Sequence, residues 1–275
     1  MITSQQLIRY YEQFGAMEVT FTKQVTQAFR LLAKFVFLKC GADTLPCLIY
    51  STSMREAKVI ANLRASSFRA LQQAGNLVAL RYCFERSEHS EPLSFFVAAK
   101  LTGYTAYNKE APDLYLLSLE YTHRPPDDLI ELLGSLLEAN VNSRQRKEAR
   151  IDINPASLKS LGLEAKEAVL SLSGSEQRCL LRDLSFSGAK VLVYGKAEAL
   201  VEKKVILYLD FSEQKQPLAL PGKVLRFESV ANREDIGAIA ILFDEDKIPM
   251  PYKMAINNYL RQHRFSAPAA PREEA

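Results

Sequence analysis

The chain reads QRCLLRDLSFSGAKVLV between residues 177 and 193, and this stretch is the most informative about the fold class. Two runs in it, Gln177–Asp183 and Ala189–Val193, are short and typical of strands. The residues between them are rich in serine and end in glycine, residue types that favour turns. The stretch therefore predicts a β-hairpin whose turn carries a D-x-S-x-x-G motif formed by Asp183, Ser185 and Gly188.

Further strand-like runs lie on both sides of this hairpin. Several alternate apolar and polar residues with a period of two, as half-buried strands do. Short strands at close spacing predict a small barrel or sandwich. The runs are Ala149–Ile153, Glu167–Leu172, Lys204–Phe211, Leu218–Phe227 and Ile236–Phe243, and a helix over Pro249–Arg264 is expected to close the fold.

The N-terminal half mixes predicted helices with strands. One helix is expected over Ser4–Phe14, with Ser4 as its N-cap, and a second over Thr22–Phe37. The third predicted helix begins at Pro125 and has apolar residues through Leu137. The strand-like runs between them are Leu45–Ser51, Ala57–Ala61, Leu77–Glu85, Leu93–Leu101 and Leu114–Tyr121. No fixed-period repeat of solenoid length is present.

A short basic segment separates the two halves. It carries Arg146 and Arg150 as an R-x-x-x-R motif, and residues 141–150 have the same net charge, +3, as the whole chain. The predicted organisation is an N-terminal domain over residues 1–138, a linker over 139–150, a β-barrel domain over 151–264 and a disordered tail over 265–275.

R-x-x-x-R followed by D-x-S-x-x-G resembles the PilZ family. The resemblance implies a six-stranded barrel that binds cyclic di-GMP, with Arg146 and Arg150 at its entrance. The two-domain layout is similar to spirochaete members with an N-terminal PilZ-like domain. The expected class is mainly β with helices (α+β), and the N-terminal domain is either a helix-containing interaction domain or a degenerate PilZ-like barrel.

The motif residues suit such a ligand, which carries two phosphodiester charges and two guanines. An arginine fork can grip a phosphate or the O6/N7 edge of guanine with two hydrogen bonds. Asp183 can accept hydrogen bonds from guanine N–H groups, and Ser185 can donate to a phosphate or hold the turn. Gly188 permits an unusual backbone conformation and lets the ligand approach the backbone closely. Further candidate ligand contacts are Arg144, Gln145, Arg182 and Gly237.

Several alternatives remain open. The two arginines can be a solvated linker face, and the D-x-S-x-x-G residues can simply build a turn. A nucleic-acid-binding regulator would use the basic linker, with an affinity that falls steeply with salt. A barrel that signals without binding the ligand is a third possibility.

The resemblance implies a receptor whose ligand fixes the linker and changes how the two domains meet. The changed arrangement would act on a downstream protein partner, flagellar or regulatory.

The sequence gives little material for an enzyme. The usual nucleotide-binding, metalloprotease and nucleophile-elbow motifs are missing, and the three histidines are far apart. We therefore expect no catalytic residues, no metal and no cofactor. No apolar run is long enough to span a bilayer and no signal peptide is recognised, so a cytoplasmic location without membrane partners is expected.

Overall fold

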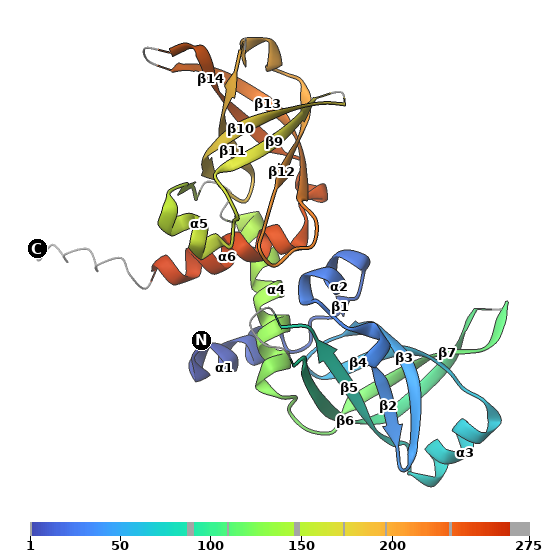
Figure 1. Ribbon diagram of the computed structural model, residues 1–275. Coiled ribbons are helices and arrows are strands. Elements are labelled where there is room, and N and C mark those ends of the chain that lie inside the picture. The colour runs from blue at the N-terminus through green and yellow to red at the C-terminus, as the bar shows by residue number, and fades with distance from the viewer. Residues whose placement is uncertain are drawn as a thin grey trace, which may run out of the picture. The chain divides into compact units, whose positions relative to one another are not determined.

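The computed structural model describes residues 2–86, 91–108, 110–145, 149–172, 174–195, 197–230 and 233–264. The chain divides into two compact units, Met1–Leu137 and Glu138–Ala275 (Figure 1). Helix α4 (Asp127–Gln145) contributes residues to both. Among the described residues, no helix combines the length and apolar character needed to cross a membrane.

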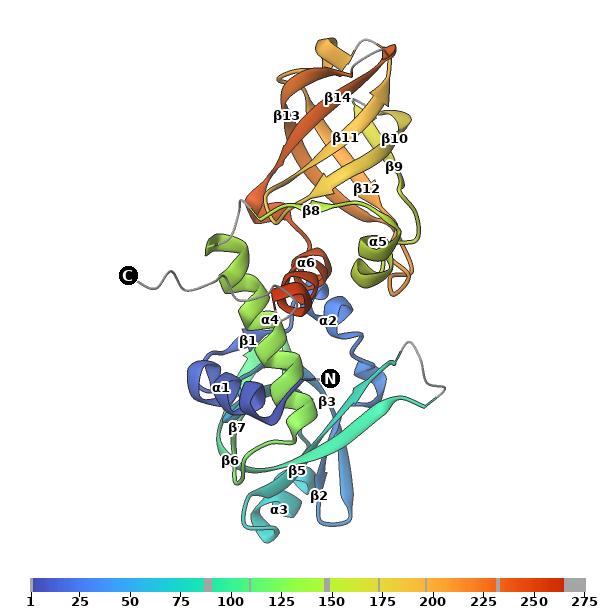
Figure 2. The same cartoon turned by 90° about the vertical axis from the view of Figure 1, so that its left-hand side faces the viewer.

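The C-terminal unit is built on a closed antiparallel barrel (Figure 2). Its six strands follow the order β11-β14-β13-β12-β9-β10, and β10 pairs with β11 to close the ring. The short β8 (Ile151–Asp152) adds to the edge of β10. This confirms the predicted six-stranded barrel. The strands are β9 (Glu167–Leu172), β10 (Ser175–Leu184), β11 (Gly188–Tyr194), β12 (Lys204–Leu209), β13 (Leu218–Val230) and β14 (Arg233–Phe243).

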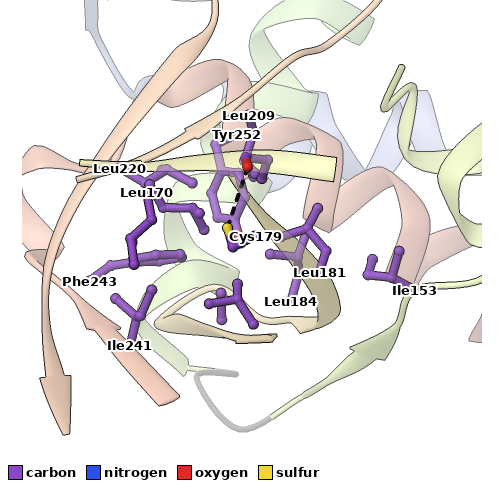
Figure 3. Packing of buried hydrophobic residues seen from close by; sticks show 14 of the residues in the cluster. Ile153, Leu170, Cys179, Leu181, Leu184, Leu209, Leu220, Ile241, Phe243 and Tyr252 are labelled. Atoms are coloured by element: carbon purple, nitrogen blue, oxygen red, sulfur yellow. Dashed lines mark hydrogen bonds between the residues drawn. The ribbon is translucent and has the colours of Figure 1, made fainter. Parts of the chain in front are cut away.

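Alternation along these strands fills the interior of the barrel. Successive side chains of a strand point to opposite faces, so every second residue of β12 is buried. Figure 3 shows side chains from several strands, among them Leu170, Leu181 and Ile241, converging in one apolar cluster. Cys179 belongs to this cluster, and burial raises the pKa of its thiol to about 12. Cys179 therefore acts as a small apolar core residue and its thiol stays protonated at neutral pH.

Two helices lie at one end of this barrel (Figures 1 and 2). The capping box of Asn154 and Ser157 starts α5 (Pro155–Leu161), and Gly162 ends it at φ 72°. Helix α6 (Met250–Arg264) buries Tyr252, whose ring stands edge-on to two phenylalanines of the core. Short 3₁₀ turns cover Ala197–Leu200 (η2) and Glu245–Lys247 (η3).

The N-terminal unit is a second closed barrel with the same topology. Its strand order is β3-β2-β5-β6-β7-β4, β3 pairs with β4 to close it, and the short β1 (Val19–Thr20) adds to β3 as β8 does to β10. A barrel is thus the alternative that holds for this half. The strands are β2 (Phe37–Cys40), β3 (Asp43–Thr52), β4 (Glu56–Asn62), β5 (Leu77–Phe84), β6 (Leu93–Asn108) and β7 (Ala111–Tyr121).

The N-terminal helices differ in part from those predicted. Helix α1 spans Ser4–Phe14 as expected, but its cap is Thr3, whose side chain accepts from the backbone N–H of Gln6, and not Ser4. The single helix expected over Thr22–Phe37 is wrong. Helix α2 (Lys23–Phe29) ends at Phe29 because Arg30 turns into the left-handed region at φ 56°. The rest of that segment forms a 3₁₀ turn, η1 (Ala33–Phe35), and β2, and a further short helix, α3 (Ala65–Gln73), follows β4.

Helix α4 continues into the segment expected to be a linker. It runs through Gln145, and its residues from Glu138 onward pack within the C-terminal unit. There Asn142 donates from its amide nitrogen to the Asn257 side chain on α6 at 2.6 Å, and Asn257 donates to Glu138 at 3.2 Å. Polar contacts buried between two helices stabilise only one relative placement of them. Residues 146–148 and the tail 265–275 lie outside the described residues.

Candidate functional site

The D-x-S-x-x-G motif joins the end of β10 to the start of β11. Ser185 fixes this turn. Its backbone N–H donates to the carbonyl of Gly188 at 2.8 Å, and its hydroxyl oxygen accepts from the Gly188 N–H at 3.1 Å. Phe186, which points into the core, is 1% exposed. The turn is therefore stabilised both by hydrogen bonds between Ser185 and Gly188 and by the burial of Phe186.

Gly188 is required by the neighbouring strand. A Cβ atom at this position would lie 2.3 Å from the carbonyl oxygen of Ile241 on β14. Its φ is not among the positive values of the described glycines, so the unusual backbone conformation expected for it is wrong. Close packing of β11 on β14 is the physical reason for the glycine.

Arg150 and Asp183 form the central ion pair of the site. Strand β8 pairs with β10 so that Asp152 lies opposite Asp183, which brings the preceding Arg150 alongside. A terminal nitrogen of Arg150 donates to an Asp183 carboxylate oxygen at 2.7 Å. The Asp183 side chain is 13% exposed, whereas that of Arg150 is 49% exposed. An arginine has five N–H donors, so this one retains donors for a ligand.

A polar pocket of about 500 Å³ lies against this pair. Its lining contains more cations than carboxylates, which favours an anionic occupant. Lys190 stands directly opposite Asp183 across the hairpin. The lining residues are Asp152, Ile153, Lys166, Arg182, Asp183 and Lys190.

Tyr252 supports the motif from inside the barrel. Its hydroxyl donates to the backbone carbonyl of Ser185 at 2.7 Å. Burial raises the pKa of this phenol strongly, and the negative charge of Asp183 raises it further. The hydroxyl therefore remains a donor, and it ties the D-x-S-x-x-G turn to α6.

The predicted site residues are only partly brought together. Asp183, Ser185, Gly188 and Arg150 meet at one place, and Arg182 lines the pocket beside them. Arg144 and Gln145 end α4 with exposed side chains, and Arg146 lies outside the described residues.

Gly237 lies elsewhere in the barrel. It pairs with Val193 at the opposite end of β11 from Gly188, and an added Cβ would lie 2.4 Å from Ala197. It lines a different pocket of about 560 Å³, together with Phe227 and Ile236. Its small size is thus explained by packing against η2 and β13.

Comparison with known proteins identifies both halves of the chain. Residues 5–140 match the PilZN3 domain and residues 145–262 match the PilZ domain. The chain is 43% identical over 256 residues to the cyclic di-GMP binding protein of Treponema denticola, and the match covers 93% of this chain and 82% of that protein. The chain belongs to the PilZ family. It is a two-domain member, and neither match is to a family of enzymes.

Two solved structures match the chain over nearly its whole length, with low TM-scores. The PlzA protein of Borreliella burgdorferi, solved with c-di-GMP, is 26% identical, with a TM-score of 0.41; the match covers 93% of this chain and 98% of that one. YcgR of Escherichia coli, also solved with c-di-GMP, is 11% identical, with a TM-score of 0.29 and coverage of 97% and 98%.

The two barrels of this PilZ protein share a stretch of sequence. Residues 45–61 and 177–193 align without a gap, and a β-bulge falls at the same place in each. Ser53 corresponds to Ser185 and accepts from two backbone N–H groups of its own turn. The positions that carry the same residue in both barrels are Cys47 and Cys179, Leu48 and Leu180, Ser53 and Ser185, Ala57 and Ala189, Lys58 and Lys190, and Val59 and Val191.

The charged groups differ between the two copies. Ser51 stands where the PilZ domain has Asp183, and Glu56 stands where it has Gly188. Glu18, just before β1, takes the place of Arg150; it accepts from the Ser51 hydroxyl and pairs with Lys58 at 2.9 Å. The N-terminal copy thus presents a carboxylate where the C-terminal copy presents a guanidinium.

Lys166, Asp152 and Tyr252 were not predicted as site residues from the sequence, and Lys190 was predicted only as a candidate for the positive rim of the barrel. The sequence does indicate the position of Lys190, because a hairpin closed by the D-x-S-x-x-G turn places it opposite Asp183. The other three come from segments distant in sequence, and only the closed barrel brings them to the motif.

Proposed function

We propose that this PilZ protein is a non-catalytic receptor for cyclic di-GMP, bound at the C-terminal barrel. The observation that carries the proposal is the Arg150–Asp183 pair beside a pocket rich in cations. The long match to the cyclic di-GMP binding protein of Treponema denticola supports this choice of ligand.

In this proposal Arg146 and Arg150 hold the phosphates or guanine edges of the ligand. Asp183 accepts from guanine N–H groups, and Ser185 and Gly188 keep the turn in place. Arg144, Gln145 and Arg182 are further candidate contacts, whereas Gly237 acts only in packing. Charge-assisted contacts contribute about 1.5–3 kcal/mol each, so a few of them reach the about −8 kcal/mol of a micromolar complex.

Calorimetric titration of the full chain with cyclic di-GMP tests the ligand. We expect saturable binding at micromolar concentration or tighter, because the pocket offers several charged donors to a dianion. A wild-type chain that gives no heat and no saturation contradicts the proposal. The full chain would then be titrated with nucleic acid, to test whether the basic residues near the end of α4 bind it. In that case the affinity should fall steeply with salt concentration.

We further propose that the ligand changes how the two domains are arranged. Arg150 lies between α4, which contributes to both units, and β8, which belongs to the site. A ligand that contacts Arg150 would bias the position of α4. The output would be a surface for a cytoplasmic protein partner in motility or gene regulation.

Solution scattering tests this rearrangement. Profiles recorded with and without saturating cyclic di-GMP are expected to differ, since a change in domain arrangement alters the distribution of interatomic distances. An Asp183→Ala chain, which should bind about 10- to 100-fold more weakly, is the control and should give one profile at a cyclic di-GMP concentration that saturates only the wild type. Superimposable wild-type profiles contradict the rearrangement and leave the binding proposal intact.

A further inference from the structure

A row of charged side chains crosses the outer face of the C-terminal barrel from the proposed site. In the strand register, Lys190 lies opposite Asp183 on one side and opposite Ala240 on the other. Ala240 in turn lies opposite Arg226. Residues paired across antiparallel strands lie on the same face. Glu228 is two residues beyond Arg226 on β13, so the row connects the pocket to a carboxylate three strands away from Asp183.

Glu228 engages the lysine that lines the pocket. The Lys190 ammonium lies 2.5 Å from one Glu228 carboxylate oxygen, and Arg226 donates to the other at 3.2 Å. The hydrogen bond from Lys190 lowers the pKa of Glu228, and the charges of Lys190 and Arg226 lower it further. Glu228 is therefore ionised at neutral pH and competes for Lys190 with any anion in the pocket.

We infer that Lys190 is a ligand-binding residue and that Glu228 is an internal competitor for it, which sets the affinity of the site for an anionic ligand. The inference rests on the proposed function. An ammonium on a flexible four-carbon chain can exchange one oxygen partner for another. A phosphate entering the pocket takes the Lys190 ammonium, and Glu228 keeps Arg226 as its partner.

The N-terminal barrel supplies a matched control. Lys58 stands opposite Ser51 as Lys190 stands opposite Asp183, and it pairs with Glu18 at 2.9 Å. The same lysine–glutamate chemistry is thus present on a barrel without the arginine and aspartate of the site. Removing Glu18 changes the net charge of the chain as much as removing Glu228 does.

The experiment is calorimetric titration of the full chain with cyclic di-GMP for Glu228→Gln, Lys190→Met, their double variant, Glu18→Gln and Lys58→Met. We expect Glu228→Gln to bind about two- to fivefold more tightly, because an exposed ion pair is weak. Lys190→Met should bind about tenfold more weakly, because a charge-assisted contact is lost. In the Lys190→Met background, Glu228→Gln should have no effect. The two N-terminal variants should match the wild type.

Three outcomes overturn the inference. One is a Glu228→Gln chain that binds no more tightly than wild type. Another is an equal gain in Glu18→Gln, which would mean that net charge alone acts. The third is a gain that persists in the double variant, which would mean that Glu228 does not act through Lys190. A wild type that binds no cyclic di-GMP overturns the proposed function itself. Circular dichroism of each variant separates these results from misfolding.

Discussion

Replacing Arg150 with alanine is expected to weaken cyclic di-GMP binding by about 10- to 100-fold. The change removes a charge-assisted contact to the ligand, of about 1.5–3 kcal/mol, and it also leaves the largely buried Asp183 without its partner. Asp183→Ala should weaken binding similarly, because it removes the acceptor for guanine. Calorimetric titration of each variant against wild type measures both effects.

Arg178 is the control for these variants. It is an exposed arginine on the same strand as Asp183, outside the residues that line the pocket, and it begins a second R-x-x-x-R with Arg182. Arg178→Ala should retain wild-type affinity. Equal losses in the Arg150 and Arg178 variants would indicate a diffuse electrostatic contribution and would remove the reason to assign a site at the motif.

Gly188→Ala is expected to lower the free energy of unfolding of the C-terminal barrel by about 3 kcal/mol. The new Cβ would lie 2.3 Å from the backbone oxygen of Ile241, so β11 and β14 must separate, and overpacking of a tight site typically costs about 1–3 kcal/mol. Urea unfolding followed by circular dichroism measures the loss.

Gly103→Ala provides the comparison for this variant. Gly103 also lies in a barrel strand, but a Cβ there would have no heavy atom within 4 Å, so the unfolding free energy should change little. Because the two barrels can unfold separately, each transition is analysed by itself. A Gly188→Ala chain as stable as wild type would mean that the strands adjust easily, and it would remove the packing explanation for this glycine.

Much of the C-terminal barrel was accessible from the sequence. Period-two alternation of buried residues predicts strands, and the D-x-S-x-x-G turn fixes which two strands form the hairpin that carries the site. Arg150 is close to the motif because β8 follows it at once and pairs with β10. Both features depend on residues close together in sequence, which remain close together in the folded hairpin, so they can be predicted from the sequence.

What the sequence did not predict depends on contacts between distant residues. The apolar spacing over Thr22–Phe37 suits a helix, yet Arg30 ends α2 and the segment that follows pairs in the barrel, where Leu31 bridges to Phe84. Tertiary pairing here outweighs helical periodicity. The duplication of the barrel is likewise invisible to a search for short repeats, since its two copies are separated by nearly half the chain.

The polar contact between α4 and α6 lies close in sequence to Arg150 of the proposed site. Asn142 is held by Asn257, and Ile151 is held by pairing with Leu184, so the short stretch between α4 and β8 is anchored at both ends. Folding therefore already covers part of the entropy cost of placing Arg150 beside Asp183, and in the proposed site its guanidinium has a high effective concentration at the pocket before a nucleotide binds.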